Sequence, residues 1–376
     1  MKKSRFIYII AVLTSFIILS NIVGCSDKSA EESLRAEVES LRTQISEQTE
    51  NTIPTKQDNE STSQETSTET TTDELKYSEG LEFVSLGNGT ALLKSKGSCS
   101  DTILNIPPQT PDGETIIEID KEAFLGSNMT SVIIPDTVTI IGSGAFYRCT
   151  SLTSIVIPNS VTKIGNEAFW ECNSLISIDI PNSVTEIGSS AFYKCTSLTS
   201  IRISNSITTI NEYTFHDCLS LSEVEIPNSV TTIGKEAFMW CSSLSSVVIP
   251  DSVNTIEESA FRLTGLESVD IPGSVKNIEE YAFSYCDHLT QVIINDGVEF
   301  IGKYAFSNCG SLLEISVSNS VSTISNCAFA GCPVLRTVTI PEGVVSSNDW
   351  KIFEGCIRLT SINEKSPKDY FENWPY

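Results

Sequence analysis

The stretch LTSIVIPNSVTKIGNEAFWEC, residues 152–172, decides the fold because the same phrase returns along most of the chain. A phenylalanine equivalent to Phe169 occurs eleven times, at intervals of 22 to 24 residues. These phenylalanines lie at positions 124, 146, 169, 192, 215, 238, 261, 283, 306, 329 and 353. Self-similarity at a fixed period is typical of a solenoid, in which each unit contacts only its neighbours.

The first half of the phrase predicts a short strand. Leu152, Ile155 and Ile157 follow the L-x-x-L-x-L spacing of a leucine-rich repeat. Side chains alternate along a strand, so Ile155 and Ile157 should face the interior and Val156 should face outward. Pro158 ends the strand because it has no N–H group to donate to a ladder.

The second half predicts a return to the core and a tight reversal. We expect Gly165 to allow the reversal and Ala168-Phe169 to open a short turn or helical turn. One helical turn would place Cys172 on the same inward face as Phe169. About seven buried apolar side chains, at roughly 1.5–3 kcal/mol each, do not offset the entropy of ordering one repeat. The repeats are therefore stable only as a stack.

The phrase S-L-x-S-I-x-I-P-x-S-V-x-x-I-G-x-x-A-F-x-x-C resembles the repeat of BspA-type leucine-rich-repeat surface proteins, over roughly residues 76–365. The resemblance implies a β-rich solenoid of about eleven repeats in residues 120–364, after an N-terminal cap in residues 75–119. Gly87-Asn88-Gly89 should turn a hairpin in that cap, and the tail, residues 365–376, should close the other end. Known members are surface or secreted proteins, several of them adhesins toward host proteins or other bacteria. The resemblance therefore implies an extracellular protein or glycan as partner.

The N-terminus has the pattern of an export signal. Lys2, Lys3 and Arg5 precede an uncharged, mostly apolar run over residues 6–23. The run ends at Gly24-Cys25, which resembles the lipobox of bacterial lipoproteins. That resemblance implies a signal peptide over residues 1–24 and a lipidated Cys25, which anchors the protein to the membrane at the cell surface. An uncleaved N-terminal membrane span is the alternative, and both place the repeats outside the cytoplasm.

Two segments separate this anchor from the cap. Residues 25–50 include a short helical stripe with heptad character, made by Leu34, Val38, Leu41 and Ile45. Residues 51–74 form a Ser/Thr/Glu-rich tract that we expect to be a disordered linker.

Charge and motifs exclude several classes of function. Lys and Arg number 24 against 48 Asp and Glu, and a net charge of −24 disfavours nucleic acid and anionic lipid as partners. His216-Asp217-Cys218 gathers a base, an acid and a nucleophile, but a helical turn would point Cys218 inward and His216 outward. We expect no enzymatic activity, no cofactor and no metal site.

Nine of the twelve cysteines occupy one slot of the repeat. We interpret them as a stack of reduced, buried thiols, because free cysteine behaves as a small hydrophobe. Disulfides between successive rungs are the alternative. Cys99 and Cys327 lie outside this slot and remain unassigned.

Two surfaces are candidates for ligand contact. The outward slot of the strands includes Asp179, Arg202 and Glu225 and would lie on a concave, polar sheet. The residue after each phenylalanine should be largely exposed, and a contiguous exposed aromatic strip often marks a protein or sugar contact. That strip comprises Tyr147, Trp170, Tyr193 and His216, with Trp240 one place further on. Alternatively, these rings only shield the turns.

The leading hypothesis is therefore a monomeric, tethered adhesin or recognition module. A structural surface coat or spacer without a specific ligand is one alternative. A subunit that docks another envelope protein, through the helical stripe of residues 34–45, is another.

Overall fold

The computed structural model of the protein describes residues 77–344, 350–371, 374 and 375. The expected signal peptide, Cys25, the helical stripe and the linker all lie outside these residues. The described residues belong to one compact unit, Asp73–Tyr376. Within these ranges, no helix combines the length and the apolar character needed to cross a bilayer.

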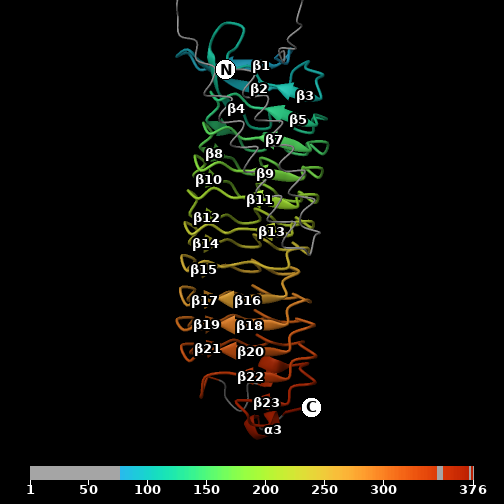
Figure 1. The fold of residues 1–376 in the computed structure, drawn as a ribbon, viewed down its shortest axis with the longest axis vertical. Coiled ribbons are helices and arrows are strands. Elements are labelled where there is room, and N and C mark those ends of the chain that lie inside the picture. The colour runs from blue at the N-terminus through green and yellow to red at the C-terminus, as the bar shows by residue number, and fades with distance from the viewer. Residues whose placement is uncertain (1–76, 345–349, 372–373, 376) are drawn as a thin grey trace, which may run out of the picture. The chain divides into compact units, whose positions relative to one another are not determined.

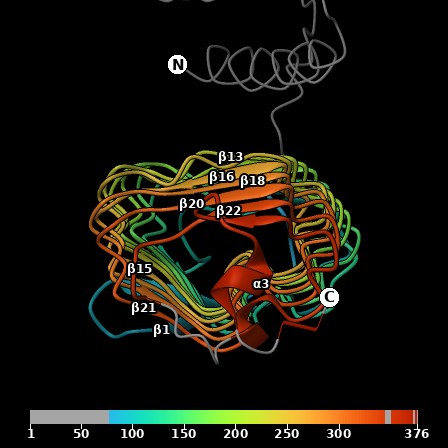
Figure 2. The ribbon, with the colours of Figure 1, turned by 90° about the horizontal axis from the view of Figure 1, so that it is seen from below.

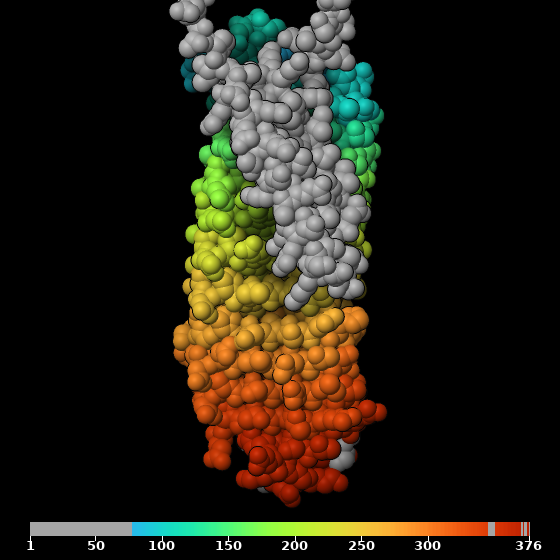
Figure 3. Space-filling view, viewed as in Figure 1, coloured from blue at the N-terminus to red at the C-terminus, as the bar shows by residue number. Residues whose placement is uncertain are grey.

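The unit is a solenoid of short strands stacked in chain order, as predicted (Figure 1). The same order is visible on the surface as successive colour bands (Figure 3). Along one side, strands pair in parallel in two six-stranded ladders, except that β1 and β2 are antiparallel. The first ladder contains β1 (Glu82–Ser85), β2 (Thr90–Ser95), β4 (Thr115–Ile119), β6 (Ile140–Ile141), β8 (Lys163–Ile164) and β10 (Glu186–Ile187). The second contains β12 (Thr209–Ile210), β14 (Thr232–Ile233), β15 (Thr255–Ile256), β17 (Asn277–Ile278), β19 (Phe300–Ile301) and β21 (Thr323–Ile324).

The predicted leucine-rich-repeat strands form the other side, which we call the strand face (Figure 2). Its strands are β3 (Ile103–Asn105), β5 (Ser131–Ile133), β7 (Ser154–Val156), β9 (Ser177–Asp179), β11 (Ser200–Arg202), β13 (Glu223–Val224), β16 (Ser268–Ile271), β18 (Gln291–Ile294), β20 (Glu314–Val317), β22 (Thr337–Thr339) and β23 (Ser361–Ile362). The predicted alternation is confirmed: Ile155 and Ile157 are buried, whereas Val156 is exposed.

The phenylalanines form one continuous ladder through the interior. Successive rings from Phe124 to Phe353 lie nearly parallel, with centroids 5.2 to 5.7 Å apart. All eleven are essentially without solvent contact. The period of the sequence thus becomes a column in space, because each rung repeats the previous one in register.

The nine repeat cysteines form a second interior column of reduced thiols, as predicted. Each Sγ–H donates to the backbone carbonyl of the phenylalanine one rung earlier, at 3.1 to 3.3 Å. Burial raises the pKa of Cys149 to about 12 and that of Cys286 to about 11. These thiols are therefore hydrogen-bonded core groups and poor nucleophiles. Cys99 and Cys327 are also reduced and buried.

A tight turn follows Gly165, as predicted. The glycine is not needed there for a left-handed φ, because its φ lies outside that region, but for a close approach between rungs. A Cβ at Gly165 would lie 2.5 Å from the backbone nitrogen of Ser143. The equivalent slot one repeat after Gly188 holds Asn211, whose Nδ2 donates to the Ile187 carbonyl at 2.6 Å. At this point the first ladder ends at β10 and the second begins at β12.

Both ends of the stack are covered. At the N-terminal end, Gly87-Asn88-Gly89 turns the antiparallel β1–β2 hairpin, as predicted. Near the C-terminal end, the 3-10 helix η1 (Trp350–Phe353) is followed by β23 and the helix α3 (Pro367–Tyr370). Phe371 packs on Phe353 with ring centroids 6.2 Å apart, so the segment after α3 covers the last rung of the phenylalanine ladder.

Candidate functional site

The outward side chains of the strand face interact across rungs. Arg202 on β11 forms an ion pair with Asp179 on β9, and both side chains remain about half exposed. Glu225 directly follows β13 and is also exposed. The structure therefore brings Asp179 and Arg202 together. Exposed pairs of this kind contribute about 0–1 kcal/mol to stability, so the fold does not depend on them.

The strand face is interrupted between β13 and β16. Residues 245–250 form no strand, and Val248 is 81% exposed, more than any other large hydrophobic residue in the part of the chain that the structure describes. A hollow of about 390 Å³ lies beside it, between Val247 and Pro272. The interruption coincides with a shortened repeat, since Phe261 and Phe283 are only 22 residues apart.

In each repeat, the segment around the phenylalanine lies on one edge of the solenoid. The sequence predicts either a short turn or a helical turn there, and the structure has tight turns. Glu167 and Glu171 adopt left-handed φ angles of 57° and 54° on either side of Phe169. This geometry points backbone N–H groups along the stack. Phe169 N–H donates to the Ala191 carbonyl and Glu171 N–H to the Tyr193 carbonyl, each at 2.8 Å. We call this edge the turn edge.

The predicted aromatic strip lies on the turn edge, but its expected exposure is wrong. Tyr147, Trp170 and Tyr193 are only partly exposed, and His216 is buried at 8%. The rings stack on one another, with centroids 5.8 Å apart for Tyr147–Trp170, 3.8 Å for Trp170–Tyr193 and 4.8 Å for Tyr193–His216. Stacked rings cover each other's faces, so for these four residues the structure supports the shielding alternative. Trp240 does differ, since it is 41% exposed.

His216 ends the stack in an acidic environment. Its Nδ1 lies 3.4 Å from Asp217 and its Nε2 lies 3.3 Å from Glu236. Burial lowers the pKa of His216 below its ordinary value, and the two carboxylates oppose that shift. Cys218 points into the core, where burial raises its pKa. The base and the thiol therefore face different environments, as predicted.

The turn edge changes character beyond His216. Arg262 continues the column and lies over the rings of Tyr281 and Tyr285, 5.3 and 5.5 Å from their centroids. Ser284 and Ser307 then occupy the slot, are buried, and share a hydrogen bond of 2.9 Å. Cation–π contacts of this kind recur on the edge.

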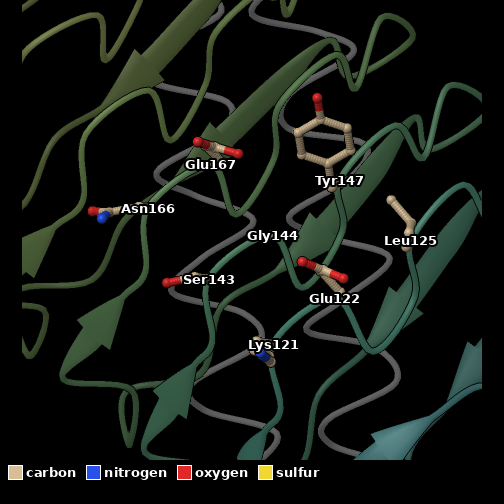
Figure 4. Close-up of a pocket in the computed structure, with 8 residues that line it drawn as sticks. All are labelled: Lys121, Glu122, Leu125, Ser143, Gly144, Tyr147, Asn166 and Glu167. Atoms are coloured by element: carbon tan, nitrogen blue, oxygen red, sulfur yellow. The ribbon is translucent and has the colours of Figure 1, made fainter.

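A hollow of about 470 Å³ opens at the start of the aromatic strip. It lies where Gly144 supplies no side chain, with Glu122 and Glu167 on either side and the Tyr147 ring beside them (Figure 4). Leu125, which is 52% exposed, forms the apolar part of its wall. Lys121, Ser143 and Asn166 complete the lining.

No three His, Cys, Asp or Glu residues in the ranges described are arranged to hold a metal ion.

The repeats match a known family over most of the chain. The BspA type leucine rich repeat region matches residues 117–244, 208–333 and 299–374, with six copies of its unit. The chain belongs to the BspA-type leucine-rich-repeat family.

Three solved structures are similar to this BspA-type protein. A leucine-rich repeat protein from Bacteroides ovatus is 25% identical, over 79% of this chain and 97% of that one, with a TM-score of 0.45. A leucine rich cell surface protein from Faecalibacterium prausnitzii is 27% identical, over 76% and 93%, with a TM-score of 0.45. The pneumococcal vaccine antigen PcpA is 21% identical, over 76% and 86%, with a TM-score of 0.53. No curated protein matches the chain.

Sequence reasoning missed two features of the BspA-type turn edge. The first is the cation–π contact of Arg262. The sequence feature that could have predicted it is the pair of tyrosines, Tyr281 and Tyr285, in the next repeat. The second is the hollow at Gly144. Its signal was a glycine in a slot where the neighbouring repeats carry Glu122 and Glu167.

Proposed function

We propose that this BspA-type protein is a non-catalytic binding module, tethered to the outer surface of a bacterial cell through Cys25. The observation that carries the proposal is the contrast between the two sides of each strand. Inward positions repeat the same apolar residues in every rung, because the core requires them. Outward positions at the same register change from Val156 to Asp179 to Arg202 to Glu225, although the fold gains little from any of them.

A regular stack that holds variable side chains at a fixed spacing suits recognition of an extracellular protein or glycan. Strands in a sheet are about 4.8 Å apart, so neighbouring outward residues can contact one partner together. The family resemblance supports the same role, and the export pattern before Cys25 supports the location.

The test is a binding screen with the full-length protein displayed on cells. Matrix proteins, mucins, glycans and other bacteria are offered to the wild type and to two variants. One variant carries Asp179→Asn, Arg202→Gln and Glu225→Gln on the strand face. The other carries Trp240→Ser and Tyr285→Ser, which replace exposed rings and leave the stacked ones in place.

Saturable binding that one variant loses while it stays folded would support the proposal and place the contact. Absence of saturable binding across the screen would favour a structural coat or spacer. Binding that disappears only when residues 34–45 are deleted would favour a docking subunit. Metabolic labelling with a fatty acid, compared between wild type and Cys25→Ser, tests the anchor.

A further inference from the structure

The hollow at Gly144 is a vacancy in an otherwise filled column. Its slot, two residues before the phenylalanine, holds Glu122 in the rung before and Glu167 in the rung after. Gly144 shares their left-handed backbone, with φ 61° against 55° and 57°. The backbone there is therefore the ordinary one for this slot, and only the side chain is missing. Two rungs separate the glutamates by roughly 10 Å along the stack.

Four of the polar side chains around the vacancy are unpaired. Among the residues that the structure describes, the side chains of Lys121, Glu122, Ser143 and Glu167 have no hydrogen-bond or ion-pair partner, whereas Asn166 accepts a hydrogen bond from the Ser189 N–H at 3.0 Å. Two other places on the turn edge do carry ion pairs: Arg148 pairs with Glu171 at 2.8 Å and Lys235 with Glu258 at 2.9 Å. The hollow thus keeps two carboxylates available beside an aromatic ring.

Two carboxylates and a tyrosine ring favour a cation over a neutral ligand. The edge itself shows this chemistry, because the chain's own basic side chains lie over its tyrosines. Lys194 lies 5.4 Å from the Tyr193 centroid and Lys303 lies 4.9 Å from the Tyr304 centroid. A sugar would need an open ring face, whereas Tyr147 has Trp170 on one side and Arg148 nearby at 5.5 Å. The net charge of −24 also draws basic partners to the surface.

We infer that the hollow at Gly144 receives a basic side chain, preferably arginine, of a partner polypeptide. The guanidinium would lie between Glu122 and Glu167, beside the Tyr147 ring, with its stem against Leu125. Arginine suits the site better than lysine because its planar donor fork bonds carboxylates in pairs. The inference rests on the proposed function, since it names the chemistry of one contact of the binding module.

The test uses the full-length protein and two peptides, acetyl-Gly-Arg-Gly-amide and its citrulline counterpart. Citrulline keeps the shape of arginine and removes the charge. The protein carries ¹³C-labelled tyrosine, and the Tyr147 ring signal is assigned with Tyr147→Phe. We expect the arginine peptide to shift the Tyr147 signal saturably, and the citrulline peptide to leave it in place. At 1 M salt the shift should weaken, because the screening length falls to about 3 Å.

Three variants sharpen the test. Glu122→Gln combined with Glu167→Gln should weaken arginine binding about fivefold, as expected for two exposed ion pairs. Gly144→Tyr should abolish binding by filling the vacancy, and Tyr213, Tyr281 and Tyr304 show that tyrosine is accepted in this slot at the same backbone geometry. Lys121→Gln should strengthen binding, because it removes the one positive charge of the lining.

Equal shifts with both peptides, or a shift that survives in Gly144→Tyr, would overturn the inference. So would a Tyr147 signal that moves with methyl glycosides and not with arginine. If the arginine peptide has no effect while displayed protein still binds a partner saturably, the inference fails and the proposed function stands. Loss of that saturable binding in Gly144→Tyr would support both.

Discussion

The phenylalanine column and the column one residue after it lie side by side on every rung and differ in kind. The first holds the same ring eleven times, fully buried. The second runs through Tyr147, Trp170, Tyr193, His216, Met239 and Arg262 and then turns small at Ser284 and Ser307. The inward column meets the same neighbours in every repeat, so the same residue, phenylalanine, packs well in each of them. The second column lies on the turn edge, where its exposure varies from partly exposed rings to buried serines, and each rung only has to fit the next.

The largest effect that we expect is the protection of the interior from chemical modification, measured as the rate at which its thiols react. Thiolate is the reactive form of cysteine, and burial keeps the nine repeat cysteines protonated. In the folded full-length protein, iodoacetamide should modify them at least about a thousandfold more slowly than in denaturant, because reaction requires rare opening of the stack. Mass spectrometry of time points measures the rates. Rapid modification of Cys218 in native buffer would contradict the buried column.

A break in the phenylalanine column should cost the most stability of any single substitution. Phe192→Ala should lower the free energy of unfolding by about 3–5 kcal/mol, because it leaves a cavity between two stacked rings. Those rings belong to Phe169 and Phe215, with centroids 5.3 and 5.6 Å from that of Phe192. Chemical denaturation measures the loss. A cost below that of Tyr193→Ala, the matched truncation one residue later, would contradict the distinction between the columns.

The stacked edge should contribute less. Tyr193→Ala removes a ring that lies 3.8 Å from Trp170 and 4.8 Å from His216. Beyond the lost burial, we expect about 0.5–1.5 kcal/mol from stacking. A double-mutant cycle with Trp170→Ala isolates the ring-to-ring contribution. Additive effects of the two substitutions would mean that the rings merely lie near each other.

The interior could be read almost completely from the sequence. A nearly constant period forces equivalent residues into columns, so Phe169 and Cys172 identify two inward positions of the repeat without knowledge of the backbone. The reasons assigned to single residues were less secure. Gly165 is needed for the approach of two rungs, and that distance depends on the stack as a whole.

The candidate site was predicted in position but not in geometry. Sequence placed Tyr147, Trp170, Tyr193 and His216 on one edge, because they share a slot. Whether such rings expose their faces or cover each other depends on side-chain rotamers and on the left-handed turns, which periodicity does not specify. The vacancy at Gly144 became visible only when its neighbours were in place.

The smallest effect concerns protonation at the end of the stack. The pKa of His216 is lowered from 6.5 in the folded protein, chiefly by burial, although Asp217 and Glu236 act in the opposite direction. A base with a lowered folded-state pKa contributes its full stability above its unfolded pKa. That contribution is lost as the pH falls from about 6.5 through the folded-state value. His216→Gln keeps a polar side chain of similar size and removes the titration. Between pH 7.5 and 5, wild type should therefore lose more unfolding free energy than the variant, measured by denaturation at each pH. Carboxylates far from His216 titrate alike in both proteins, so their contribution cancels in this difference. An identical pH dependence, or a wild type that gains stability on acidification, would mean that Asp217 and Glu236 outweigh burial at the end of the stack.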